Sequence, residues 1–196
     1  MSSHPAPEFP EESAPARLLV AARACLVERG HAACSVKLIA TQAGVNHGLV
    51  HHYFGSKEGL FAAMLDQLDQ EMDQQSVDAD TPLDLQEFLL DIVFVRAPLL
   101  NEIHGLARQH PQIRERFARF LERRRHQIGE LLGLEDPQRL RLFTAMVQGL
   151  AMQSQIERNL PLYSLVESMV RLFGRQGGAT PGPVPPSVPT PETPRS

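Results

Sequence analysis

The stretch 35–60, SVKLIATQAGVNHGLVHHYFGSKEGL, constrains the fold of this chain more than any other segment. Ser35 is placed to cap a short helix, and Gly44 can end that helix because glycine adopts left-handed backbone angles without steric cost. Asn46 is then placed to cap a second short helix, from about His47 to Phe54. Two short helices joined by a tight turn are typical of a helix-turn-helix, which places its second helix in the major groove of DNA.

The second of these helices divides into two faces. Val50 and Phe54 are spaced to pack inward, together with Val45 from the turn. The side chains expected on the outward face are short of charge, which suits a groove better than open water: His47, Gly48, Leu49, His51, His52 and Tyr53.

The helices before and after this pair can also be placed. Ser13 caps a first helix that has Pro15 in its first turn and ends at Gly30. Ser56 caps a fourth helix with Lys57 in its first turn, where a cation opposes the helix dipole unless an anion lies nearby. A DNA phosphate would be such an anion.

From Arg17 to Leu60 the chain resembles the N-terminal domain of the TetR family of bacterial transcriptional regulators. The segments RLLVAARACLVERG, SVKLIA, AGV, HHYF and SKEGL follow the order and spacing of that family. The resemblance implies that the outward residues of the second short helix lie in or beside the major groove, and that Lys57 holds a phosphate. We expect DNA contacts from Ser35, Lys37, Asn46, His47, Gly48, Leu49, His51, His52, Tyr53 and Lys57.

Two positions depart from the family pattern. Family members often carry a small hydroxyl residue where Leu49 stands and a tyrosine where His51 stands. Leu49 could contact a thymine methyl group, and the histidines could donate to phosphate or to guanine acceptors. An unusual base preference is therefore expected.

Charge is unevenly distributed along the chain, whose formal net charge is -4. The segment 13–60 holds five basic and two acidic residues, a net of +3, whereas 66–91 holds nine acidic residues and no Lys or Arg. We expect a basic DNA-binding head and an acidic region that DNA avoids. The overall acidity disfavours a non-specific architectural DNA protein, which would need many phosphate contacts.

The fold expected is all-α, with about nine helices and no strong strand candidate. A three-helix helix-turn-helix domain spans 13–56, and a helical effector-binding and dimerisation domain spans 57–176. The later helices are expected from Lys57 to about Gln75, from Thr81 and Pro82 to a break at Pro98, and then over 99–109, 111–132, 136–158 and 161–175. The arm 1–12 and the proline-rich tail 177–196 are expected to be disordered, and recognition of PVPPSVP by a proline-binding partner is a weaker alternative.

The last two helices are apolar on more than one face, which suits either a monomer core or a dimer interface. Gly149 in mid-helix favours close approach of another backbone, so we expect a homodimer. The interface residues expected are Phe143, Val147, Gly149, Leu150, Leu165, Met169 and Phe173.

A pocket for a small apolar effector with one polar handle is expected in the helical domain. Its expected lining is Phe61, Met64, Leu68, Phe88, Ile92, His104 and Phe117. A ligand that displaces the fourth helix would also tilt the DNA-binding head, which favours a repressor released by its ligand.

Three other interpretations are weighed and disfavoured. His47, His51 and His52 lack a convincing third ligand for zinc, so no metal or cofactor is expected. The arginines of 114–125 are more typical of a solvated face than of a nucleic-acid site. Cys25 and Cys34 are too few for a secreted disulfide framework and fit small core residues better than a redox switch.

No catalytic motif is present, so the chain is not expected to be an enzyme, although Asp91, Glu102 and His104 could in principle form a catalytic set. No signal peptide or long apolar span is evident, which favours a cytoplasmic protein without membrane contact. The partners expected are double-stranded operator DNA, the effector and a second copy of the chain. The alternative is a helical small-molecule-binding protein or enzyme that does not bind specific DNA.

Overall fold

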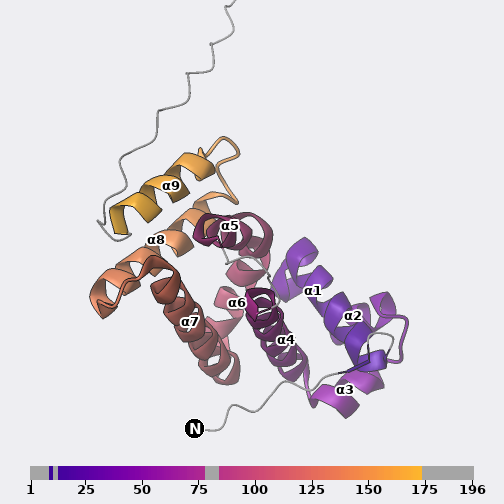
Figure 1. Ribbon diagram of the computed structural model, residues 1–196. Coiled ribbons are helices and arrows are strands. Elements are labelled where there is room, and N and C mark those ends of the chain that lie inside the picture. Colours follow the sequence, from indigo (N-terminus) through magenta and orange to yellow (C-terminus); the bar gives the residue numbers. More distant parts are fainter. Residues whose placement is uncertain (1–8, 11–12, 78–83, 174–196) are drawn as a thin grey trace, which may run out of the picture.

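The computed structural model describes residues 9–10, 13–77 and 84–173, and the described chain is helical with no strand (Figure 1). The elements in order are α1 (Ala14–Ala33), α2 (Val36–Gln42), α3 (Gly48–Phe54), α4 (Lys57–Val77), α5 (Leu85–Leu90), the π-helical segment η1 (Asp91–Arg96), α6 (Ala97–Gln109), α7 (Pro111–Leu132), α8 (Pro137–Gln153) and α9 (Leu162–Phe173). The expected all-α class is confirmed. The tail 177–196 and most of the arm 1–12 lie outside the described residues.

Helices α1, α2 and α3 form a small unit at one end of the molecule, and α8 and α9 lie at the other end (Figure 1). The side chains of Leu18, Ala22 and Leu26 on α1 are fully buried. Helix α1 therefore supplies part of the core on which α2 and α3 pack. Its cap is the one expected, since the Ser13 hydroxyl accepts the N–H of Ala16 at 3.4 Å. Gly30 has φ of 71°, which kinks the helix there before a last short turn continues to Ala33.

Helix α4 connects this unit to the rest of the chain. It begins beside α3, packs against α1 along its length and meets α7 on another side, while α6 packs on both α1 and α7. Leu60, Phe61, Leu65 and Leu68 are almost fully buried along it. A shift of α4 or α6 would therefore change their packing against α1.

The expected break at Pro98 is wrong. Thr81 and Pro82 lie outside the described residues, and the cap in the structure is Asp84, whose carboxylate accepts the N–H groups of Gln86 and Glu87. The helical run then continues through η1 into α6, with Pro98 in the first turn of α6. Proline has no N–H for the carbonyl four residues earlier, so the preceding turns widen to π geometry and the helix does not end.

Helix α7 runs to Leu132 and Gly133 ends it with φ of 60°, as expected. Helix α8 begins at the expected Asp136 cap but ends at Gln153, five residues before the expected Arg158. The Ser154 hydroxyl donates to the carbonyls of Ala151 and Val93, at 2.9 Å and 3.2 Å. Such side-chain bonds compete with the helical pattern, so the chain turns here.

The arginines of α7 form a solvated face only in part, because Arg114, Arg119 and Arg123 are exposed whereas Arg124 is buried. Arg124 is only 5% exposed and pairs with Asp69 and Asp73 of α4. Arg123 pairs with Asp69 as well, and Arg116 pairs with Asp66. The acidic residues of α4 are thus largely neutralised by α7, and the expected isolated acidic region is not present along this helix.

Candidate nucleic-acid interface

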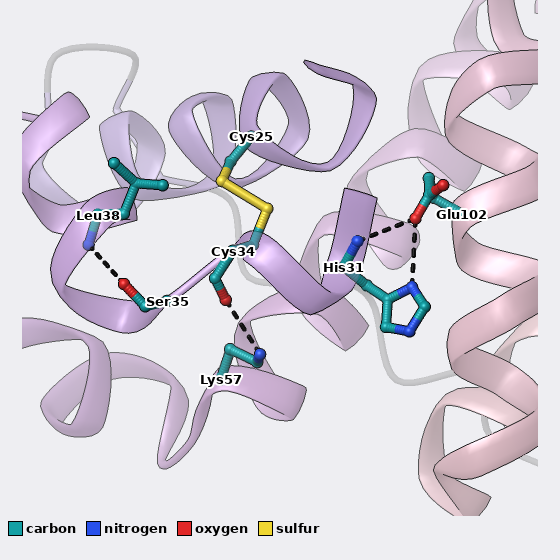
Figure 2. Close-up of a disulfide and its surroundings, with 7 residues drawn as sticks. All are labelled: Cys25, His31, Cys34, Ser35, Leu38, Lys57 and Glu102. Carbon is teal, nitrogen blue, oxygen red and sulfur yellow. Dashed lines mark hydrogen bonds and ion pairs between the residues drawn. A yellow bond between two sulfur atoms is a disulfide. The ribbon is translucent and has the colours of Figure 1, made fainter. Parts of the chain in front are cut away.

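The turn between α2 and α3 is held by backbone and side-chain caps. The Ser35 hydroxyl accepts the N–H of Leu38 at 3.1 Å (Figure 2). Gly44 has φ of 64°, and the N–H of Val45 donates to the carbonyl of Ala40 at 3.0 Å, which closes the end of α2. These caps fix the direction in which α3 leaves the turn.

Helix α3 begins at Gly48, one residue later than expected, and the helix N-cap position falls on His47. The side chain of Asn46 still stabilises this start, because its Oδ1 accepts the N–H of Gly48 at 2.8 Å. Val50 is fully buried beneath the helix. The short helix is therefore anchored at its start and at its middle.

The outward face of α3 differs from the expected one at a single residue. His47, Gly48, His51, His52 and Tyr53 are exposed. Leu49 is half-buried and packs against the core, so it is not a fully outward side chain. Ser35, Lys37 and Asn46 are also exposed on the same unit.

The ring of His51 has a defined orientation. Its Nδ1–H donates to the carbonyl of Gly55 at 3.1 Å, since a carbonyl can only accept. The neutral ring therefore offers Nε2 as an acceptor. Donation from His51 to phosphate or guanine, as expected from the sequence, would require the ring to be protonated.

Lys57 already has a partner within the chain. Its ammonium group donates to the carbonyl of Cys34 at 3.0 Å (Figure 2). The same group lies 5.8 Å from the centre of the Phe61 ring. The next residue supplies an anion in the first turn of α4: a hydrogen bond from its own backbone N–H, aided by Ser56, lowers the pKa of Glu58. Glu58 is thus an anion near the start of α4, so a DNA phosphate is not required to offset the charge of Lys57 there. The Lys57 ammonium group still has further N–H donors that could reach a phosphate.

The sequence analysis did not foresee the position of Phe9. Its ring lies 6.4 Å from the ring of Tyr53 and 6.2 Å from that of Phe54, in edge-on arrangements. This segment therefore contacts the end of α3. A lone aromatic residue in a stretch of Pro, Ser and Glu was the available signal.

The two cysteines form a disulfide, which corrects the expectation that they are separate core or boundary residues (Figure 2). Cys25 and Cys34 are both fully buried, with their Cα atoms 5.9 Å apart. The kink at Gly30 turns the chain back and brings the two residues together. The bond ties α1 to the residue just before the Ser35 cap.

A carboxylate from α6 reaches the kinked end of α1. Glu102 Oε2 accepts the backbone N–H of His31 at 2.9 Å and lies 3.2 Å from Nδ1 of the same residue (Figure 2). Asp91 pairs with Arg96, and His104 is exposed with its ring against Phe117. The structure therefore does not assemble Asp91, Glu102 and His104 into a catalytic set.

The expected effector pocket is filled by core packing. Phe61, Met64, Leu68, Phe88 and Phe117 are buried. One cavity lies farther along α4, at Met72. This cavity has a volume of about 60 Å³ and shares only Ile92 with the expected lining. Met72 is the residue of α4 that lines this cavity.

The expected dimer residues need a similar correction. Phe143, Val147 and Met169 are almost fully buried within one protomer, and Leu150, Leu165 and Phe173 are partly buried. An apolar stripe of α8 and the turn after it keeps the expected Gly149, which is half-buried, and adds four exposed residues: Leu142, Ala145, Met152 and Ile156. Leu172 of α9 is also 68% exposed.

Comparison with known proteins agrees with this geometry. Residues 18–64 match the family described as bacterial regulatory proteins, tetR family. An 80-residue segment is 40% identical to an HTH-type transcriptional regulator of Mycobacterium bovis and to an HTH-type transcriptional repressor of Mycobacterium tuberculosis. The match covers 41% of this chain and 42% of each of those proteins.

Solved structures extend the likeness in fold to most of the chain. A transcriptional regulator from Rhodococcus sp. Rha1 superposes with a TM-score of 0.71 at 23% identity, over 82% of this chain and 96% of that one. A regulator from Saccharomonospora viridis, solved in complex with choline, gives a TM-score of 0.66 at 18% identity, over 82% and 94%.

An N-terminal helix-turn-helix unit followed by a larger helical part defines a class of regulatory proteins. Within that class, the N-terminal unit of this chain, over residues 18–64, is that of the TetR family of bacterial regulators. No helix among the residues described here is long and apolar enough to cross a membrane.

Proposed function

We propose that this chain is a sequence-specific DNA-binding transcriptional regulator that acts as a homodimeric repressor and is released from its operator by a small molecule. The observation that carries the proposal is the outward face of α3, which is exposed, nearly uncharged and held in place by the caps at Ser35 and Asn46. The exposed residues of this face, with Ser35 and Lys37, are the proposed DNA contacts. Lys57 is retained as a candidate phosphate contact through its remaining donors.

Dimerisation would place two copies of α3 on a two-fold symmetric operator. The stripe of α8 defined above supports it, because its residues recur at alternating intervals of three and four, the spacing that helices use to pack along their length. An exposed apolar stripe of this kind favours burial against a second copy.

Release by an effector is supported by two connections between the helical part and α1–α3. Helix α4 extends from the cavity at Met72 to Ser56 beside α3, and α6 holds the end of α1 through Glu102 and His31. A ligand that lowers operator affinity a hundredfold must favour the released conformation by about 2.7 kcal/mol. Operator DNA must then weaken ligand binding by the same factor.

The proposal is tested by an electrophoretic mobility-shift and footprinting screen of the DNA that flanks the gene for this chain. A protected, two-fold symmetric site supports it. Detectable turnover of a small molecule by a chain that protects no DNA would favour the enzyme alternative instead.

A further inference from the structure

Phe9 lies before the start of α1, at a junction of three helices. Its side chain is half-buried and packs against the core. It borders a groove of about 310 Å³, whose other lining comes from α1 and α4: Ala16, Leu19, Gln67, Gln70, Glu71 and Gln74. Its ring also meets the last two residues of α3, Tyr53 and Phe54. Phe9 is therefore a contact between the segment before α1 and the helix proposed to contact DNA.

The backbone next to Phe9 is held in place. The N–H of Ser13 donates to the carbonyl of Pro10 at 2.8 Å, and Ser13 is also the cap of α1. Because a proline follows it, Phe9 is restricted to extended backbone angles. The Phe9 ring is thus directed toward α3 by its backbone as well as by its packing.

The Phe9 ring begins a row of aromatic rings at the end of α3. It lies 6.4 Å from the Tyr53 ring at an interplanar angle of 71°, and the Tyr53 ring lies 4.8 Å from the His52 ring at 76°. Both are edge-on arrangements, which aromatic pairs prefer over face-to-face stacking. His52 and Tyr53 are exposed on the outward face of α3. The row therefore connects a side chain outside the helix-turn-helix with two proposed DNA contacts.

Tyr53 depends on its ring contacts for its direction. It is 43% exposed, and the rings beside it belong to Phe9, His52 and Phe54. An exposed side chain has several staggered rotamers of similar energy, so the loss of a contact gives it access to more of them. Without the Phe9 ring, Tyr53 would keep ring contacts only with neighbours in its own helix, among the described residues.

We propose that Phe9 is a positioning residue for DNA recognition, which holds the Tyr53 ring, and through it the His52 ring, in the orientation that α3 presents to DNA. This role rests on the proposed function. Ordering a mobile side chain at an interface costs binding free energy, and Phe9 meets that cost before the DNA arrives. Aromatic pairs of this geometry contribute enough to change an affinity by about two- to tenfold.

The contact itself is tested on the full chain without DNA. The chain has two tyrosines and no tryptophan, so isotope-labelled tyrosine gives separate NMR ring signals for Tyr53 and Tyr163, which Tyr163→Phe assigns. Phe9→Leu keeps an apolar side chain but removes the ring, and it should shift the Tyr53 signal alone. The matched control is Phe94→Leu, which should shift the Tyr163 signal alone, because the Phe94 ring lies 6.1 Å from that of Tyr163. An unmoved Tyr53 signal in folded Phe9→Leu would overturn the contact.

The positioning role is tested by operator titrations with the same chains. Phe9→Leu should weaken operator binding about fivefold, whereas Phe9→Tyr keeps the ring and should stay within about twofold of the unmodified chain. Phe94→Leu should bind operator as the unmodified chain does. In a chain that already carries Tyr53→Leu, adding Phe9→Leu should change the affinity by less than about twofold, because the ring that Phe9 positions is gone.

Two outcomes would overturn the positioning role. One is an operator affinity that Phe9→Leu leaves unchanged. The other is an equal loss from Phe9→Leu with and without the Tyr53 ring, which would show that Phe9 only stabilises the packing before α1. Circular dichroism at the temperature of the titrations shows that each variant is folded. An unmodified chain that protects no specific DNA would overturn the proposed function and this role with it, while the NMR comparison still decides whether Phe9 holds Tyr53.

Discussion

At the scale of single residues, Lys37 of α2 and His47 at the N-cap of α3 are both exposed, and we expect them to contact different parts of the DNA. Lys37→Ala should weaken binding to operator and random DNA alike and lower the salt slope by about one unit, because it removes one phosphate contact. His47→Ala should mainly reduce the preference for operator, because it removes a base-edge contact. Titrations at several salt concentrations measure both. Equal losses on both DNAs for the two variants would contradict these roles.

Ionisation of Glu58 makes the free energy of unfolding depend on pH. Its pKa is lowered from the ordinary 4.5, first by the hydrogen bond from its backbone N–H, so the ionised form stabilises the fold. This contribution is complete above about pH 4.5 and is lost as pH falls through the lower pKa of the folded state. Glu58→Gln should therefore reduce the free energy of unfolding at pH 7 and flatten its fall in acid. An acid profile identical to that of the unmodified chain would count against this contribution.

At the scale of elements, the Cys25–Cys34 bond should stabilise the α1–α2 connection. It closes a loop with a sequence separation of nine residues, for which loss of unfolded-state entropy predicts about 2–3 kcal/mol. Denaturant unfolding with and without dithiothreitol measures the difference, and the double variant Cys25→Ala, Cys34→Ala should be insensitive to the reductant. An unmodified chain that is equally insensitive would show that the bond contributes nothing.

Local signals predicted the elements well where the stabilising group lies within a few residues. The caps at Ser13, Ser35 and Asp136 and the left-handed glycine at Gly133 are examples. Distant pairing was not predictable in this way. Arg124 looks solvated in its own helix, and only the fold brings it to Asp69, 55 residues earlier in the chain.

The candidate sites show the same limit. The exposed histidines of α3 could be inferred from local spacing, whereas the residues expected to line an effector pocket are mostly buried in the core. Periodicity identifies an apolar face of α4 but does not say which part of that face meets a neighbour and which part borders a cavity. The disulfide could not be predicted either, because it depends on the direction in which the chain turns at the Gly30 kink.

At the scale of the whole molecule, Gly149 tests the proposed dimer. A methyl group added there would meet no atom within 4 Å in one protomer, among the described residues. Gly149→Leu should therefore leave the protomer folded but weaken dimerisation by steric exclusion. Sedimentation across micromolar concentrations measures this, with Ser164→Leu on the exposed surface of α9 as the control. A fully monomeric unmodified chain would contradict the proposed dimer.

The central claim is that α3 selects a particular DNA sequence. The most direct test is the ratio of affinities for the DNA protected near the gene and for random DNA of equal length, at one fixed salt concentration. We expect a ratio of at least about a thousand, with two protected half-sites about one helical turn or more apart. Equal affinity for the two DNAs would contradict the claim.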